Sequence, residues 1–317
     1  MYHRWTENGL NLWISYVDDC LNVGHPKDVE EARDRMLQEF DCDDIGKFEE
    51  CIGCKIDINR EERSLRITQP TLIQSFEDEF GAKASDGMST PAIPGSVLKI
   101  EEGDKALEGE QLTKHRSGVG KLLHLVKWSR PEIKNVIRDL SRFMTGAATK
   151  HVKAMMRAVN HVVSAKTRGK HLKPEGNWDG KDRNFLFDVG GRSDSDFCND
   201  PIARKSISGT SVTLNKAPVV ERSRMQKCVT LSVTEAEVMA AVECAQDMLF
   251  AANLLESLGL KVKKPMILEC DNKGAIELVH GWQANGRTRH VANKIHCLQE
   301  LKENGEILMK CVKTEDN

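Results

Sequence analysis

Three carboxylates in the last third of the chain have the types and positions that divalent-metal chemistry requires. Asp194 lies in a predicted strand, Glu237 in a long predicted helix, and Asp271 at the carboxyl end of a later predicted strand. Hard divalent cations prefer oxygen ligands, and two ions roughly 3.5–4 Å apart can hold both the attacking water and the leaving oxygen of a phosphodiester. The pattern indicates a candidate metal centre for phosphodiester hydrolysis.

The predicted helix around Glu237 is the most informative of these elements. With about 100° of rotation per residue, Glu237 lies on the apolar face and Glu235 on the polar face. The apolar face also carries Ala240, Ala241, Cys244, Met248, Ala251, Ala252 and Leu255. A buried acid is costly unless it is paired or binds a cation, so this position favours a ligand role for Glu237.

Each of the three acids also has an ordinary structural interpretation. Glu237 fits a capping box with Thr234, and Asp271 fits a helix N-cap. Asp194 on its own fits a loop acid. Taken singly, these interpretations are at least as good as a ligand role. Taken together, the acids lie on elements that would bring them to one edge of one sheet.

The elements that must position these acids follow a β-β-β-α-β-α order. The predicted strands and helices, in chain order, are strands 185–197, 206–215 and 218–225, helix 235–258, strand 266–271, helices 273–280 and 291–304, and strand 307–312. This order predicts a mixed α/β sheet with helices packed on it.

A second pair of carboxylates, Asp18 and Asp19, lies near the start of the chain between predicted strands 12–16 and 20–23. The pair is therefore expected at a tight hairpin turn. Adjacent acids repel each other, and a divalent ion relieves that repulsion. The ordinary alternative is a polar turn.

The region that follows the hairpin is predicted to alternate between helices and strands. A capping box at Asp28 opens a helix, and residues 48–58 alternate as one strand. In one strand, Cys51 and Cys54 would point to opposite faces, which argues against metal chelation. Residues 96–184 are predicted to begin with a loop rich in glycine and acidic residues and to end in turns rich in glycine and lysine. Between them we expect helices with breaks at Arg130-Pro131 and Thr145-Gly146.

Composition restricts the class of protein. Hydrophobic residues make up 39% and charged residues 30% of the 317 residues, which is typical of a soluble globular protein. No run approaches the roughly 20 apolar residues that span a bilayer, and the scattered cysteines without a signal peptide indicate a reducing compartment. The net charge is −2, but residues 114–174 are basic, which fits either a phosphate-backbone contact or a solvated helical surface.

Six ordered motifs resemble the ribonuclease H domain of copia-type LTR retrotransposon Pol polyproteins. They are GRSDSDFCND (191–200), RKSISG (204–209), LSVTEAE (231–237), CDN (270–272), RTRH (287–290) and KTED (313–316). The resemblance implies a nuclease-type fold that cuts the RNA strand of RNA–DNA hybrids with Mg²⁺ or Mn²⁺. Asp194 would bridge two ions, with Glu237 and Asp271 holding one each.

The chain departs from that family pattern at several positions. Arg192 stands where the family usually has an aromatic residue, Phe197 where it has Trp, and Val238 where it has Tyr. The family's fourth acid follows the last motif by a few residues, and the sequence ends at Asn317. Weaker metal binding or impaired product release is the expected consequence.

The Tyr16-Val-Asp-Asp19 hairpin resembles the reverse transcriptase signature, in which the paired Asp bind Mg²⁺ beside the primer end. Further motifs fall in family order at 48–53, 89–91, 115–120 and 129–132. About 11 residues precede the first predicted strand, so the fingers, most of the palm and an upstream Asp are expected to be missing. Primer extension is therefore not expected from this chain alone.

The resemblance implies an α+β and α/β multidomain protein. Residues 1–95 would form a partial reverse transcriptase palm and the start of the thumb, 96–184 a helical connection, and 185–317 a ribonuclease H-like domain. The implied partners are RNA–DNA hybrid, template–primer nucleic acid and other parts of the Pol polyprotein, without a membrane, in the cytoplasm or nucleus.

Other interpretations stay open. Arg287, Arg289 and His290 fit either contacts to the hybrid backbone or a solvated turn. The chain could also be an inactive retrotransposon remnant that binds nucleic acid without catalysis. An integrase is disfavoured because its acids follow the order Asp, Asp, Glu.

Overall fold

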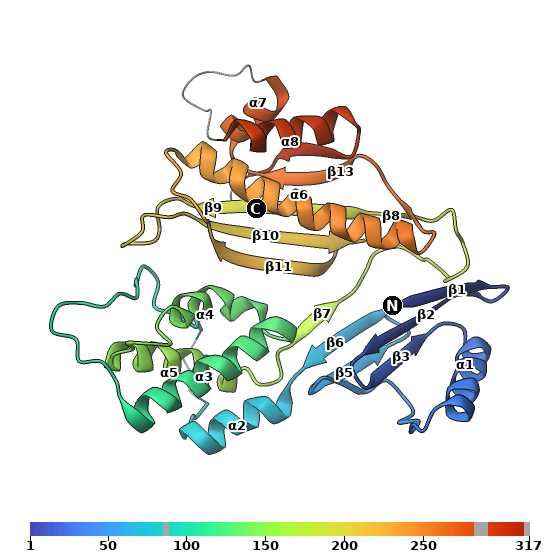
Figure 1. The fold of residues 1–317 in the computed structure, drawn as a ribbon, viewed down its shortest axis with the longest axis horizontal. Coiled ribbons are helices and arrows are strands. Elements are labelled where there is room, and N and C mark those ends of the chain that lie inside the picture. The colour runs from blue at the N-terminus through green and yellow to red at the C-terminus, as the bar shows by residue number, and fades with distance from the viewer. Residues whose placement is uncertain (85–88, 282–290, 314–317) are drawn as a thin grey trace.

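The structure, a computed structural model, describes residues 1–84, 89–281 and 291–313. Its largest sheet has the order β11-β10-β9-β13-β14 (Figure 1). The five strands are β9 (Val189–Asp196), β10 (Ile207–Leu214), β11 (Ala217–Met225), β13 (Met266–Cys270) and β14 (Ile307–Cys311). The first three are antiparallel, and β13 runs parallel to both β9 and β14. The carboxyl ends of β9 and β13 therefore lie at the same edge of the sheet.

Three helices accompany this sheet: α6 (Val233–Ser257), α7 (Lys273–Gly281) and α8 (Ala292–Glu303). Helix α6 packs along β9 and β10, and its side chains Val238 and Met248 join Val189, Val212 and Leu268 in one buried core. The expected element order and mixed sheet are confirmed. The first predicted strand is divided, because β8 (Leu186–Phe187) leaves the sheet and pairs with β12 (Lys261–Val262).

Helix α6 differs from expectation in one respect. Among the described residues it is the one helix long and apolar enough to cross a membrane by length and composition alone. Half of its apolar window is buried inside the protein, including Ala241, Cys244 and Met248. The apolar character of α6 is thus explained by its place in the core.

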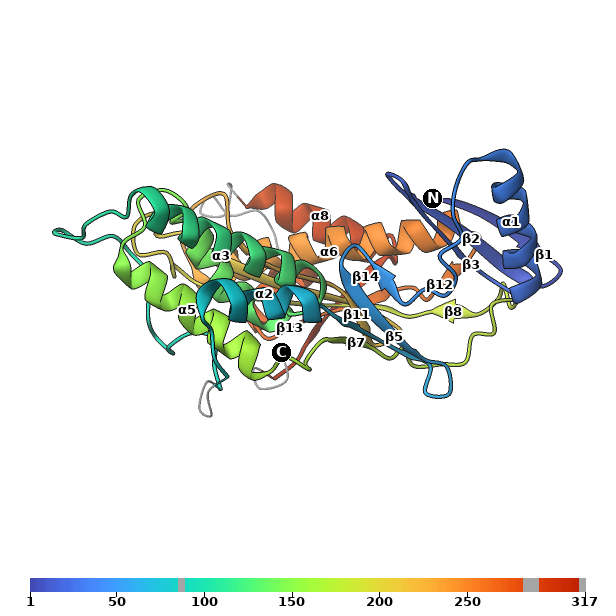
Figure 2. The same ribbon diagram turned by 90° about the horizontal axis from the view of Figure 1, so that it is seen from below.

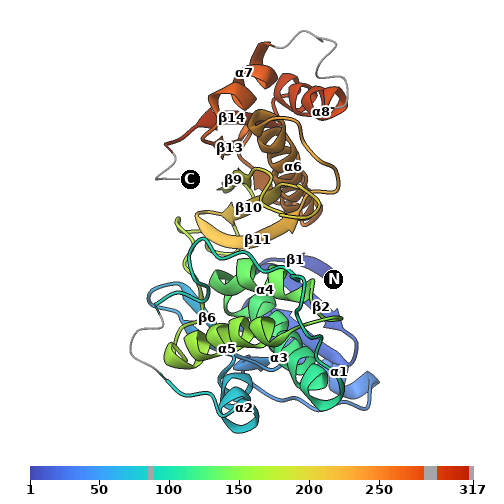
Figure 3. The same cartoon turned by 90° about the vertical axis from the view of Figure 1, so that its left-hand side faces the viewer.

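A second core lies among the helices of the middle region. The helices are α2 (Pro70–Phe80), α3 (Gly109–Trp128), the 3-10 turn η1 (Pro131–Ile133), α4 (Lys134–Ser141) and α5 (Thr149–Ser164). Their shared core includes Phe76, Leu122, Ile137 and Val159. Figure 3 shows α4 facing β11, and Arg138 Nη1 donates to Ser223 Oγ over 2.6 Å across this contact. The two predicted helix breaks are confirmed.

The four-stranded sheet corrects the prediction for residues 48–58. Its strands are β4 (Glu50–Cys51), β5 (Cys54–Asn59), β6 (Ser64–Thr68) and β7 (Lys170–Leu172). Ile52 and Gly53 have φ angles of 51° and 68°, so the chain folds back between β4 and β5. Cys51 pairs directly with Cys54, and the prediction that they point to opposite faces of one strand was wrong.

The N-terminal sheet adds a strand that the sequence analysis missed. Strand β1 (Tyr2–Thr6) pairs with β2 (Gly9–Tyr16), which pairs with β3 (Asp19–Val23), and α1 (Pro26–Glu39) follows. This sheet lies beside the separate two-stranded β8–β12 sheet (Figure 2). Trp5 Nε1 donates to the Leu258 carbonyl over 2.8 Å. Helix α1 begins at Pro26, and Asp28 does not cap it but accepts from Thr6 Oγ1 over 2.7 Å.

Candidate metal centre

The N-terminus of α6 is capped in a way that leaves Glu237 available. Ser232 is the N-cap, and its Oγ accepts from the Glu235 amide over 3.2 Å. The Glu235 carboxylate accepts from the Leu231 amide over 2.7 Å, which explains why Glu235 is buried rather than on a polar face. The capping box of Thr234 and Glu237 was therefore the wrong interpretation.

Asp271 is likewise not needed as a helix cap. The residue that precedes α7 is Asn272, and its Oδ1 accepts from the Ala275 amide over 2.9 Å. Asp271 directly follows β13, at the sheet edge where β9 also ends.

Glu237 is tied to the strand that carries Asp194. Its side chain is 3% exposed, and its Oε1 accepts from the Ser195 amide over 3.1 Å and from Ser195 Oγ over 2.7 Å. Ser195 is the neighbour of Asp194 on β9. These two bonds fix the carboxylate of α6 against the end of the strand.

The ligand atoms of Glu237, Cys270 and Asp271 all lie within 4.8 Å of one another. Asp194 is not a member of that group of three, but it lies close enough for its charge to act on Glu237. Burial raises the pKa of Glu237 to about 7, and the charges of Asp194 and Asp271 add to the rise. Burial also raises the pKa of Asp194, with a further contribution from Asp271.

The structure thus brings the three predicted acids into electrostatic contact and adds Cys270, which the sequence analysis missed. A period-2 reading of β13 could have found it, because Met266, Leu268 and Cys270 share the buried face. A bound divalent cation relieves the repulsion between carboxylates that lie close together. Oxygen donors from Asp194, Glu237 and Asp271 fit Mg²⁺ or Mn²⁺.

The raised pKa of Glu237 predicts how the stability of the metal-free protein depends on pH. The unfolded chain releases this proton near pH 4.5 and the folded chain near pH 7, so the folded state holds more protons between these values. The free energy of unfolding should therefore fall by up to about 3 kcal/mol as the pH rises from 4.5 through 7. Urea unfolding in EDTA measures this slope, and Glu237→Gln should flatten it. An equally steep slope in that variant would contradict the prediction.

The second predicted acid pair lies where the sequence placed it. Tyr16 pairs with Asp19 across a hairpin whose turn residues are Val17 and Asp18. Both aspartates are exposed. Among the described residues, no group of three possible metal-binding side chains includes either of them. Arg287, Arg289 and His290 lie outside the described residues.

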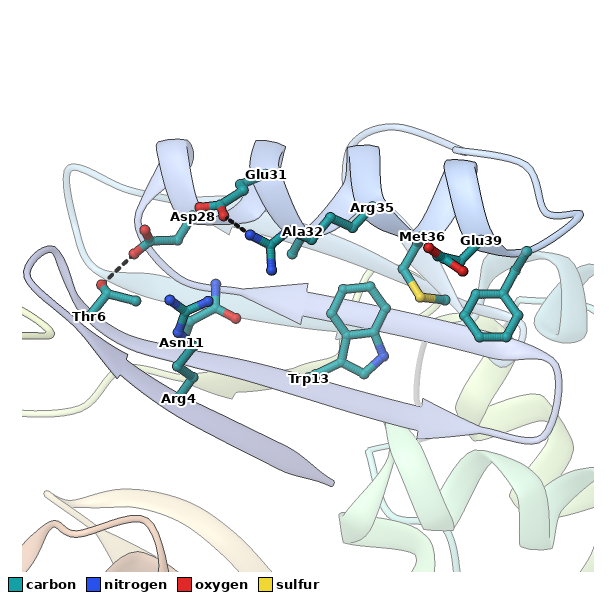
Figure 4. Close-up of a pocket in the computed structure, with 11 residues that line it drawn as sticks. Arg4, Thr6, Asn11, Trp13, Asp28, Glu31, Ala32, Arg35, Met36 and Glu39 are labelled. Atoms are coloured by element: carbon teal, nitrogen blue, oxygen red, sulfur yellow. Dashed lines mark hydrogen bonds and ion pairs between the residues drawn. The ribbon is translucent and has the colours of Figure 1, made fainter.

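A cavity of about 310 Å³ lies between α1 and the β1–β2 hairpin (Figure 4). Its lining includes the apolar side chains of Trp13, Met36 and Phe40, together with charged side chains such as Arg4 and Arg35. None of the lining residues is one of the predicted site residues.

Comparison with known proteins finds relatives that match this chain over all or nearly all of its length. No family model matches the chain. It is 28% identical over its full length to the retrovirus-related Pol polyprotein from transposon TNT 1-94 of Nicotiana tabacum, of which it covers 23%. It is 27% identical over 96% of its length to the corresponding polyprotein from transposon RE1 of Arabidopsis thaliana, of which it covers 20%. The chain spans less than a quarter of these relatives.

Among solved structures, the chain is similar to LC11-RNase H1 in complex with an RNA/DNA hybrid. The similarity has a TM-score of 0.32 at 13% identity, and it covers 41% of this chain and 88% of that one.

Proposed function

We propose that this chain, whose curated homologues over its whole length are copia-type retrovirus-related Pol polyproteins, contains a ribonuclease H-like nuclease that hydrolyses the RNA strand of RNA–DNA hybrids. One observation carries the proposal. Glu237 and Asp271 lie close together at the edge of the sheet where β9, the strand that carries Asp194, also ends. Burial raises the pKa of Glu237 and of Asp194, and the negative charge of Asp271 adds to both rises. Such a cluster is suited to hold divalent cations against a phosphodiester.

The proposed roles of the residues follow from their surroundings. Ser195 holds the Glu237 carboxylate through two hydrogen bonds, and Asp271 directly follows β13, an interior strand of the sheet. Asp194 lies on β9, next to Ser195, which donates to Glu237. Mg²⁺ or Mn²⁺ bound by these carboxylates would supply an activated water and neutralise the phosphate charge.

The same homology covers residues 1–184, so the proposal extends to them. The β1–β3 sheet with Asp18 and Asp19 on its hairpin would be part of a reverse transcriptase palm, and the α2–α5 helices would be thumb and connection. The partners would be RNA–DNA hybrid, template–primer and further parts of the polyprotein, inside the cell.

The test is cleavage of a labelled RNA strand in an RNA–DNA hybrid, with Mg²⁺ or Mn²⁺, by the wild type and by Asp194→Asn. We expect metal-dependent cutting that the variant loses while its circular dichroism spectrum is unchanged. A wild type that binds the hybrid without cutting it would overturn the proposal and favour an inactive remnant. Cutting that Asp194→Asn retains would refute the role of Asp194.

A further inference from the structure

The proposed nuclease centre contains a thiol for which oxygen-based metal chemistry has no use. Cys270 is fully buried, and its Sγ lies 3.8 Å from Glu237 Oε2. It shares with Glu237 and Asp271 the one group of three possible ligand side chains among the described residues. The thiol is thus part of the centre itself.

The spacing of these three side chains fits a tetrahedral cation with a sulfur ligand. Zn–S bonds of about 2.3 Å and Zn–O bonds of about 2.1 Å separate two ligand atoms on one ion by roughly 3.6 Å. The observed separation of 3.8 Å between Cys270 Sγ and Glu237 Oε2 is close to that value. The third member, Asp271, needs only a small side-chain movement because all the ligand atoms lie within 4.8 Å of one another.

The soft sulfur ligand favours some divalent cations over others at this site. Mg²⁺ takes oxygen ligands and gains nothing from a thiol, whereas Zn²⁺, Co²⁺ and Cd²⁺ bind thiolate together with carboxylate. Coordination would displace the thiol proton to solvent and form the metal–sulfur bond. Within the group of Glu237, Cys270 and Asp271, a soft cation therefore has three ligands, whereas Mg²⁺ has only the two carboxylates.

We propose that Glu237, Cys270 and Asp271 form a mixed oxygen–sulfur site that binds a thiophilic divalent cation of the Zn²⁺ class and thereby blocks the nuclease. Two of the three acids proposed for Mg²⁺ are occupied in that state, so both kinds of cation compete for them. The inhibition rests on the proposed nuclease function, whereas the binding does not.

The binding test uses Co²⁺, whose bond to thiolate gives a charge-transfer band in the near ultraviolet. The exposed cysteines are first alkylated in the folded protein, which spares buried Cys270. We expect the wild type to develop the band on titration and lose it when excess Mg²⁺ is added. Cys270→Ser and Cys270→Ala should show no band, and Asp271→Asn should weaken apparent Co²⁺ affinity by at least about tenfold.

Cys244→Ser is the matched control. Cys244 is also buried, but its Sγ lies 3.3 Å from the Arg192 carbonyl, and it does not belong to the three-residue group. This variant should keep the band. A wild type without the band, or a band that survives in both folded Cys270 variants, would overturn the proposal.

The inhibition arm measures hybrid cleavage against Zn²⁺ concentration, with each protein normalised to its own rate without Zn²⁺. The Zn²⁺ concentration for half-inhibition should rise at least about tenfold in Cys270→Ser relative to Cys244→Ser. If no variant cleaves while the Co²⁺ band behaves as expected, the nuclease proposal fails and the binding site stands. If cleavage is present and its Zn²⁺ sensitivity is the same in both variants, the blocking role is refuted.

Discussion

Glu237→Gln should reduce hybrid cleavage by about a thousandfold or more without lowering the thermal stability of the metal-free protein. Gln keeps the size of the side chain, and its Oε1 can still accept from the Ser195 amide and hydroxyl. It removes the charge that would hold a cation, and loss of about 4 kcal/mol of transition-state stabilisation corresponds to a factor of 10³. Because Asp194 and Asp271 no longer face a third carboxylate, the melting temperature should stay the same or rise.

Glu235→Gln is the control for this variant, since it makes the same chemical change two residues away. Glu235 accepts from the Leu231 amide at the helix start and lies outside the group of metal-binding side chains. Weakening that bond should cost about 1 kcal/mol of stability and leave cleavage in place. Cleavage rates and melting curves of both variants decide the matter. Loss of cleavage in both, or a Glu237→Gln variant that cleaves like the wild type, would show that Glu237 is not a metal ligand.

The two glutamates also show how far the sequence alone could go. Helical periodicity places Glu237 on the buried face correctly, because packing against the sheet determines that face. The same periodicity places Glu235 on the polar face, and that was wrong. The amides at the start of a helix have no partner within the helix. Side chains in the first turn, such as Glu235, bend to form capping bonds with them, so their burial does not follow the helical periodicity.

Other differences have causes that lie outside local sequence. Strand β1 is too polar to be predicted, and its position depends on Trp5 reaching Leu258, 253 residues away. Residues 48–58 alternate as one strand would, but left-handed turn residues at Ile52 and Gly53 divide them. The sequence pattern around Cys270 is that of an ordinary core residue of a strand. Cys270 belongs to the candidate site only because the fold brings Glu237 of α6 next to it.

Gly191→Val should destabilise the fold by about 3 kcal/mol and abolish cleavage with it. Gly191 lies on β9 and faces the Met248 and Cys244 side chains of α6. A Cβ there would lie 2.3 Å from Met248 Sδ and 2.8 Å from Cys244 Sγ, which is far inside van der Waals contact. The branched side chain therefore forces the buried side chains of Met248 and Cys244 to shift within a closely packed core. Urea unfolding gives the change in free energy.

Gly209→Ala is the matched control on the neighbouring strand β10. A Cβ at Gly209 meets only the Asp194 carbonyl at 3.8 Å, an ordinary contact. Alanine in a strand interior is favoured over glycine by about 0.5–1 kcal/mol, so this variant should be as stable as the wild type or slightly more so. Equal stability of Gly191→Val and Gly209→Ala would contradict the packing argument.

A second substitution, Met248→Ala, tests whether the packing of β9 against α6 also positions Glu237. Met248→Ala removes the side chain that a Cβ at Gly191 would strike first, so the pair Gly191→Ala and Met248→Ala should cost less than the sum of the two single changes. The close approach of β9 to α6 is also what lets Ser195 reach Glu237. We expect Gly191→Ala to lower both stability and cleavage, and the second substitution should restore part of each. Stability that recovers without cleavage would mean that the distance between strand and helix does not position Glu237.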